Sequence, residues 1–208
     1  MNQAIKKFGE SIDKKFRDSQ NRVWSVINLN VVMCFYDLGR RISDHHSKFI
    51  DQADYFKCLS DELVSTTGQQ LIFSVDSLKL FEKFYNLYQQ YYSKFPFDYE
   101  KAMNGYFIPE SFDHIISLPW SLNELIVKKC SDVEEAFFYV EEAYFGKWTK
   151  KQLIENLEKN SYKDPNYIVN TEGRSLFDLL TGKNRPTFRK DSMSKEIKGF
   201  FTLEKERI

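Results

Sequence analysis

The sequence predicts an all-α fold: a multi-helix domain with a helix-turn-helix-like core and little or no sheet. Glycine and proline are scarce, with 8 and 5 residues among 208, whereas sheet-rich and loop-rich chains need more turn residues. Apolar residues recur three and four positions apart over long stretches, which is the spacing of one helix face. Three segments also match the capping box, in which two side chains satisfy free N–H groups at a helix start.

The first fifty residues contain two periodic runs. Residues 4–16 place an apolar residue at every fourth position: Ala4, Phe8, Ile12 and Phe16. Residues 22–47 continue with the same kind of spacing, and the polar residues 18–21 between the runs either break the helix or bend it. Gly39 interrupts the second run, at a cost of about 1 kcal/mol relative to Ala. Close approach of a neighbouring helix would explain this glycine.

The middle of the chain predicts a helical pair followed by a loop. Residues 53–67 form a shorter helix that Gly68 is placed to end. Ser74 or Asp76 can cap the strongly periodic helix that follows. Residues 94–113 contain prolines and lack periodicity, so we expect a loop of about twenty residues there.

Three helix starts follow in close order. The capping-box matches are Ser121 with Glu124, Ser131 with Glu134, and Thr149 with Gln152. Gly146 ends the middle helix, and a short helix runs over 175–181. We therefore expect one helical domain over 1–160, with a helical arm over 1–20, and a basic, partly irregular extension over 161–208.

Charge and cysteine content limit the classes of function. The net charge is zero, but residues 1–50 carry +4, residues 51–150 carry −7 and residues 151–208 carry +3. This balance argues against broad nonspecific DNA binding, so any DNA contact must be local. Three cysteines without a CxxC pair are typical of reduced thiols, and no segment is apolar enough for a signal or a membrane span. We expect a cytoplasmic protein that does not contact membranes.

The segment from Tyr55 to Tyr92 reads as helix, turn, helix. In a DNA-binding helix-turn-helix, the start of the second helix enters the major groove. The candidate DNA-contacting residues at that start are Ser74, Ser77, Lys79 and Lys83. An ordinary helical hairpin in an all-α core explains the same pattern.

Several blocks in sequence order resemble the N-terminal domain of YhcG-type proteins. The first runs from Asn28 through Phe35, Tyr36 and Leu38-Gly39-Arg40-Arg41-Ile42. Later blocks are Leu59 to Leu63, Phe73 to Tyr85, Leu118-Pro119-Trp120-Ser121, Phe138-Tyr139 and Trp148 to Leu153. The resemblance covers roughly residues 20–160. It implies a helical, winged-helix-like domain that usually precedes a PD-(D/E)XK nuclease domain, often in restriction or mobile-element neighbourhoods.

This sequence departs from the YhcG-type pattern at three places. Leu122 stands where a His commonly follows Trp-Ser, and Val75 and Asp76 stand where basic residues are frequent. The chain also ends where the nuclease domain would begin. We therefore expect no nuclease activity.

The residues predict no catalytic site, no metal site and no cofactor. Asp164-Pro165 and Glu196-Ile197-Lys198 imitate the letters of a nuclease site, but no strand pattern carries them. His45 and His46 point about 100° apart on a helix and have no Cys or third His near in sequence. Both are better read as a polar helix end. Trp120 and Trp148 are better read as core anchors than as stacking platforms.

Two functions remain open. The first is a non-catalytic DNA-binding or targeting module of a nuclease-associated system. Its further candidate contacts are the pair Arg40 and Arg41 and the basic tail Lys183, Arg185, Arg189 and Lys190. That tail is equally explained as a solvated linker towards a partner. The second function is an interaction or scaffold subunit, which either docks a separate catalytic chain such as a nuclease or assembles with itself as a homo-oligomer.

Overall fold

The computed structural model describes residues 3–49, 53–92 and 110–168, and helices account for almost all of its regular structure. In chain order these are α1 (Gln3–His46), α2 (Tyr55–Thr67), α3 (Val75–Tyr92), α5 (Glu110–Ser117), α6 (Trp120–Lys129), α7 (Val133–Phe145), α8 (Lys150–Lys159) and the 3₁₀ helix η1 (Ser161–Lys163). No strand occurs within these three ranges, so the all-α prediction is confirmed.

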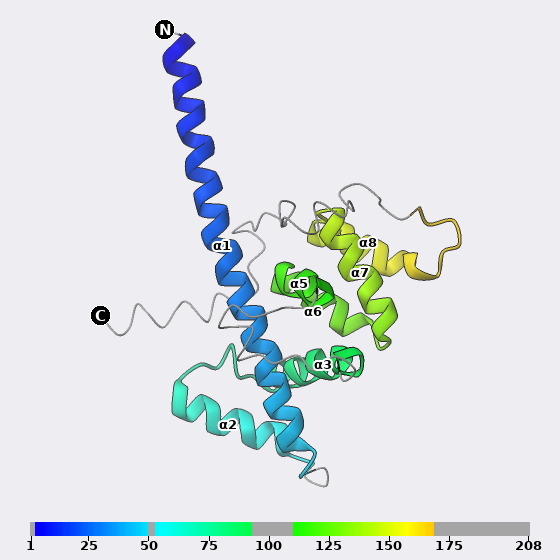
Figure 1. The fold of residues 1–208 in the computed structure, drawn as a ribbon. Coiled ribbons are helices and arrows are strands. Elements are labelled where there is room, and N and C mark those ends of the chain that lie inside the picture. The colour runs from blue at the N-terminus through cyan, green and yellow to red at the C-terminus, as the bar shows by residue number, and fades with distance from the viewer. Residues whose placement is uncertain (1–2, 50–52, 93–109, 169–208) are drawn as a thin grey trace.

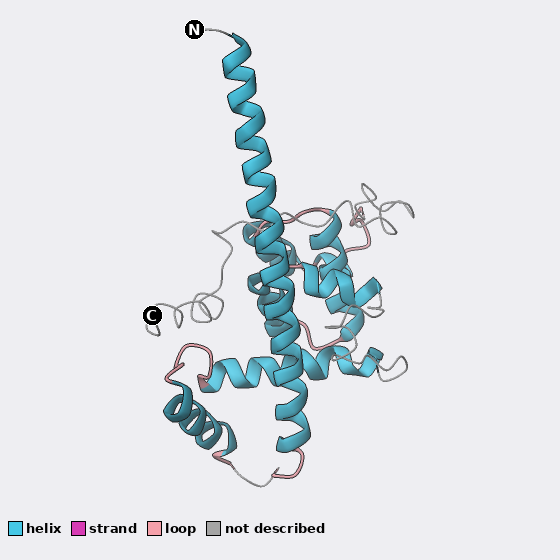
Figure 2. Cartoon of the chain, turned by 60° about the vertical axis from the view of Figure 1, so that its left-hand side comes forward, coloured by secondary structure: helices cyan, strands magenta, loops and turns pink. Residues whose placement is uncertain are grey.

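Helix α1 is the long axis of the fold (Figure 1). Its C-terminal half crosses α3 and also contacts α5 and α6. Helices α6 and α7 pack on α3, and α8 packs on α6 and α7. Its N-terminal half extends beyond the other described helices in both views (Figures 1 and 2). None of the helices in the described part of the chain combines the length and apolarity needed to cross a membrane.

The polar residues 18–21 do not break α1. Arg22 donates a hydrogen bond to the Ser19 hydroxyl at 3.0 Å, and the Ser25 hydroxyl donates to the Asn21 carbonyl at 2.9 Å. Each of these bonds joins residues three or four apart, so both partners lie on the same helix face. The polar residues therefore bond within the helix, and it runs on without interruption.

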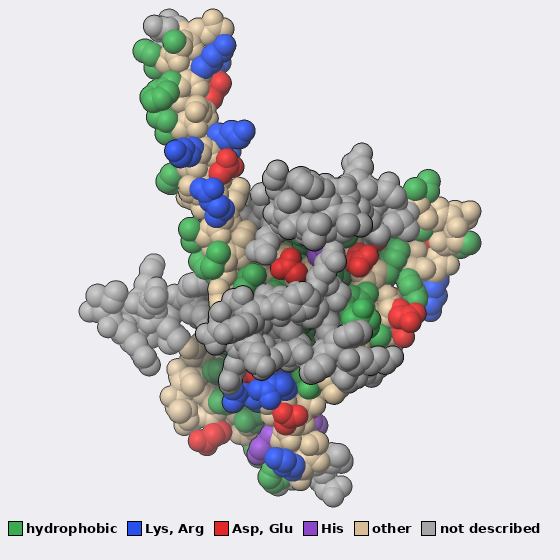
Figure 3. Space-filling view, viewed as in Figure 1, with side chains coloured by type: hydrophobic (Ala, Val, Ile, Leu, Met, Phe, Trp, Pro, Cys, Tyr) green, Lys and Arg blue, Asp and Glu red, His purple; other side chains and the backbone are tan. Residues whose placement is uncertain are grey.

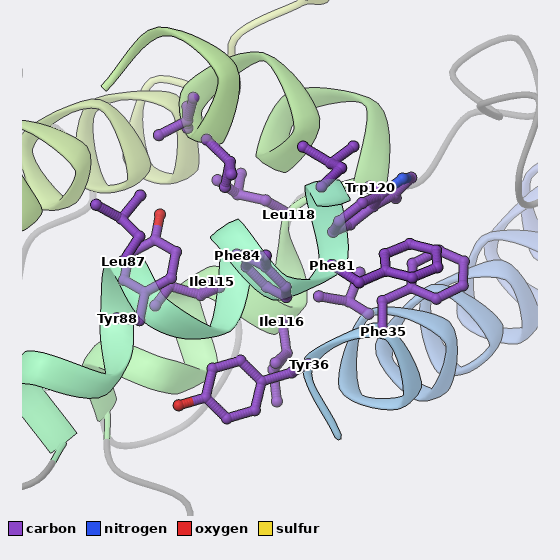
Figure 4. Packing of buried hydrophobic residues seen from close by; sticks show 14 of the residues in the cluster. Phe35, Tyr36, Phe81, Phe84, Leu87, Tyr88, Ile115, Ile116, Leu118 and Trp120 are labelled. Carbon is purple, nitrogen blue, oxygen red and sulfur yellow. The ribbon is translucent and has the colours of Figure 1, made fainter. Parts of the chain in front are cut away.

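Aromatic side chains from α1, α3 and α6 form the centre of the core (Figure 4). The ring of Phe35 stacks on Phe81 with centroids 4.4 Å apart, and the edge of Trp120 meets Phe35 at 4.8 Å and Phe84 at 5.2 Å. All four side chains are fully buried. Trp120 is thus a core anchor, as its sequence context predicts. Trp148 is partly buried and packs against the same core.

Gly39 lies where α1 crosses α3. A Cβ atom added at Gly39 would overlap the carbonyl oxygen of Phe81 and lie only 2.9 Å from the Cβ of Tyr85. The prediction of a close helix approach at this glycine is confirmed. Gly68 also ends α2 as predicted, with a left-handed φ of 72° and its N–H bonded to the Val64 carbonyl.

Helix starts agree with the predictions at two positions. The Ser74 hydroxyl accepts the N–H of Ser77 at the start of α3, and Thr149 forms a complete capping box with Gln152 at the start of α8. The other two capping-box predictions are wrong. Asp132 takes the place predicted for Ser131 by accepting the N–H groups of Glu134 and Glu135. Ser121 lies buried inside α6, which begins one residue earlier at Trp120.

The loop predicted over 94–113 is partly helical. Helix α5 begins at Glu110, so the last four residues assigned to the loop belong to a helix. The remainder of that loop and the helix predicted over 175–181 lie outside the described residues.

Candidate functional site

The start of α3 has its polar side chains committed to internal bonds. The Ser77 side chain is only 2% exposed, and its hydroxyl lies 2.9 Å from the Ser74 hydroxyl and donates to the Leu71 carbonyl. Ser74 in turn caps the helix. Asp76 is exposed in the first turn of α3, where it would repel a phosphate backbone. Ser74 and Ser77 thus stabilise the turn between α2 and α3.

The two lysines of α3 are exposed but contact neighbouring helices. The ammonium of Lys79 lies 5.6 Å from the ring centroid of Phe56 on α2, a cation–π distance. Lys83 donates to the Lys128 carbonyl at 3.4 Å, near the C-terminus of α6, where a cation is favoured by the helix dipole. The candidate DNA-contacting residues of α3 therefore contact the turn before α3, helix α2 and helix α6.

Arg40 and Arg41 converge on one carboxylate. Arg40 donates two hydrogen bonds to Oδ1 of Asp37, at 3.1 and 2.8 Å, and Arg41 donates to Oδ2 at 2.7 Å. The hydrogen bond to Asp37 raises the pKa of the Arg40 guanidinium. A second carboxylate, Asp44, lies 3.6 Å from Arg40. Much of the charge of this pair is thus compensated within α1, which weakens its attraction for phosphate.

The remaining DNA candidates, Lys183, Arg185, Arg189 and Lys190, lie outside the described residues. A shallow depression of about 460 Å³ lies beside α2 and the turn before α3. Among the described residues that line it, Asp61 is the single charged one, so it is poorly suited to an anion.

The two adjacent histidines contact different elements. Nδ1 of His45 lies 3.1 Å from the Tyr55 hydroxyl on α2, whereas Nδ1 of His46 lies 2.8 Å from Oε1 of Glu82 on α3. The His46 ring also stacks on Tyr55 at 4.4 Å. This arrangement ties the end of α1 to both helices. Within the described ranges, no group of three or more His, Cys, Asp or Glu side chains is placed to hold a metal ion.

The other chemically reactive groups occupy structural positions. Burial raises the pKa of the Cys130 thiol to about 12 and also raises the pKa of Cys34, so both are neutral thiols near pH 7. Asp164 accepts the backbone N–H of Asn166 at 2.9 Å in a local turn. It is not on a strand, and Glu196 lies outside the described residues.

The feature that stands apart from the folded core is the first half of α1, residues 3–26, here called the arm. At 1.5 Å per residue the arm is about 36 Å long. Most of its large apolar side chains are 54–67% exposed, and we call these the arm stripe: Ile5, Phe8, Ile12, Phe16, Val23 and Val26. Trp24 is half-buried and does not belong to the stripe. Figure 3 shows apolar side chains gathered along the edge of the arm that faces away from the rest of the fold. Contact with the core begins at Ile27 and Asn28.

One comparison with known proteins gives a match. A family model described as the DUF1016 N-terminal domain matches residues 11–164, from the arm to the end of η1. The chain belongs to this family. It is the family of the YhcG-type N-terminal domain, which the sequence blocks resemble. No curated protein and no solved structure matches the chain.

In this DUF1016 N-terminal domain, the blocks that carry the resemblance hold the fold together. Asn28, 1% exposed, donates from Nδ2 to the carbonyls of Leu118 at 2.9 Å and Ile116 at 3.3 Å. Its Oδ1 accepts the N–H of Trp120 at 3.2 Å. Asn28 therefore caps the start of α6 from 92 residues away, which explains why Ser121 is not needed there.

Sequence reasoning missed three features of this domain. The role of Asn28 had no local signal, because its partners are remote in sequence. The compensation of Arg40 and Arg41 did have one, since Asp37 precedes them by three and four positions and so lies on the same helix face. The exposure of the arm stripe had none, because periodicity reveals an apolar face without showing what covers it.

Proposed function

We propose that this domain is a non-catalytic interaction module that holds another protein chain on its projecting arm, within a nuclease-associated system. The observation that carries the proposal is the arm stripe. Exposed apolar patches of this size on a folded domain are typical of protein interaction sites. The nuclease association rests on the YhcG-type resemblance.

The helical state of the arm supports the same proposal. Most helices in proteins owe their stability to packing of an apolar face and little to propensity. Among the described residues of the arm there is one i,i+4 ion pair, between Arg17 and Asp13 at 2.9 Å. An exposed pair of this kind stabilises a helix by only about 0.3–0.5 kcal/mol. Residues 27–46, in contrast, pack into the core. A protein surface along the stripe would supply the missing packing.

A photo-crosslinking residue on the stripe tests this function in cells. With p-benzoylphenylalanine in place of Phe8 or Phe16, we expect a discrete protein adduct after irradiation, because the ring would lie inside the interface. The same residue in place of Lys14, on the opposite face of the arm, is the matched control and should give little adduct. Absence of any protein adduct at Phe8 and Phe16 would remove the interaction function.

DNA targeting is the second candidate function. It is favoured by the segment Lys183 to Lys190, which holds four basic residues and no acid. If the tail contacts phosphates, plots of log affinity against log salt should be steeper by about 3–4 units for the full chain than for a chain ending at Gly182. Changing both Lys79 and Lys83 to Ala should leave the slope unchanged, because these lysines serve internal contacts. Equal slopes for the two chain lengths would eliminate the tail as a DNA contact.

A further inference from the structure

We infer that the chain held on the arm stripe is the arm of a second copy of this protein, packed antiparallel to the first. This inference rests on the proposed interaction function and names its partner. It is carried by the symmetry of the stripe, the direction in which it faces, its charges and its area.

The stripe matches itself when one copy is reversed. Ile5, Ile12, Phe16 and Val23 are spaced symmetrically about position 14. Antiparallel pairing about that point sets Ile5 of one copy against Val23 of the other, and Ile12 against Phe16. Phe8 and Val26 fall opposite positions 20 and 2 of the partner, which are polar, so four of the six stripe residues form the symmetric apolar pairs. A symmetric dimer requires such a self-complementary patch, because each contact in it occurs twice.

The direction of the stripe leaves room for this partner. The apolar side chains face away from the helical body of their own copy (Figure 3). A second arm can therefore lie along them without displacing α2 to α8. In the antiparallel arrangement the partner's first residues reach Val26, just before Asn28 enters the core. The two bodies then lie at opposite ends of the paired arms.

Charges along one flank of the arm are complementary in antiparallel pairing. Asp13 and Arg17 lie one helical turn apart and already form an ion pair within the arm. Reversing the second copy brings its Arg17 within a turn of Asp13 of the first, so acid lies opposite base.

The area available predicts a reversible dimer. Six large apolar side chains, each more than half exposed, offer on the order of 600 Å² per copy. A standard stable interface uses about 800 Å² per partner. The arm pair falls slightly below that size, so we expect a dimer that dissociates on dilution rather than an obligate dimer.

Sedimentation equilibrium of the full chain tests the pairing. We expect a monomer–dimer equilibrium for the wild type, and at least about 100-fold weaker association for Phe8→Glu with Phe16→Glu, because the new carboxylates would be buried without partners. The matched control, Lys7→Glu with Lys14→Glu, changes the opposite face of the same turns and should retain the dimer. None of these four side chains contacts the core, so we expect the folded body to be unchanged in both double variants. A wild-type chain that stays monomeric at about 100 µM, or a stripe variant that dimerises normally, overturns the inference.

Disulfide trapping tests the orientation. In a background with the exposed Cys58 changed to Ser, a mixture of Ile5→Cys and Val23→Cys chains should form the mixed disulfide under mild oxidation. Each variant alone should dimerise poorly, because the two introduced thiols would lie at opposite ends of the paired arms. Efficient 5–5 and 23–23 disulfides would overturn the antiparallel arrangement.

The photo-crosslinking result separates this inference from the proposed function. With the crosslinking residue in place of Phe8, an adduct of twice the chain mass supports both the interaction function and the second copy as partner. An adduct with a different protein, or a crosslink within one chain to its own C-terminal segment, overturns the second copy as partner. A different protein as partner leaves the interaction function standing, whereas absence of any intermolecular adduct removes both.

Discussion

Replacing Gly39 by Ala should destabilise the domain, although a Gly to Ala change inside a helix usually raises stability by about 1 kcal/mol. The added methyl group would overlap the Phe81 carbonyl oxygen and lie 2.9 Å from the Tyr85 Cβ. The first of these atoms belongs to the backbone of α3, so relief requires α1 and α3 to separate. We expect a loss of about 1–3 kcal/mol for Gly39→Ala and more for Gly39→Leu, measured by urea unfolding.

Gly9 is the matched control for Gly39. It lies in the same helix, and a Cβ added there would meet nothing within 4 Å. Gly9→Ala should therefore leave the core unfolding transition unchanged or raise helicity slightly. If both substitutions shift the unfolding midpoint equally, the helix crossing at Gly39 is not as close as the structure shows.

Features that depend on local sequence were predictable. The 3.6-residue periodicity identified the helices, Gly68 has the left-handed φ that a helix-ending glycine favours, and Thr149 and Gln152 are close enough in sequence to reveal their capping box. Gly39 was also predictable, because a glycine inside a strongly apolar run needs a packing reason.

Features that depend on tertiary contacts were not predictable. The start of α6 was misplaced because Asn28 supplies its cap, and no pattern near Ser121 records that. The candidate DNA residues on α3 were chosen as polar or basic residues at a helix start. Position in the sequence could not show that Ser77 is buried or that Lys83 meets the end of α6. The arm was recognised as amphipathic, but amphipathicity is the same whether the partner is the chain's own core or another molecule.

The largest effect of a single substitution is expected at Asn28. Asn28→Leu keeps the same branched arrangement of heavy atoms, with methyl groups larger than the amide atoms. It therefore leaves no cavity but removes three hydrogen bonds at once. The carbonyls of Ile116 and Leu118 and the N–H of Trp120 lie in the core, where an unsatisfied polar group costs about 1–3 kcal/mol. Leu118 keeps one long bond, from Asn123 at 3.3 Å, which offsets part of the loss.

We therefore expect Asn28→Leu to lower the unfolding free energy by about 3–5 kcal/mol in urea titrations followed by far-UV circular dichroism. Asn30→Leu is the matched control two residues along the same helix. Its amide is exposed and bonds only to the Val26 carbonyl one turn back, so the change should stay within about 0.5 kcal/mol. The two asparagines differ in what they hold: Asn30 bonds within its own helix, whereas Asn28 joins α1 to the turn between α5 and α6. Similar losses for both variants would mean that this turn finds other hydrogen-bond partners, and that Asn28 does not fix the position of Trp120 in the core.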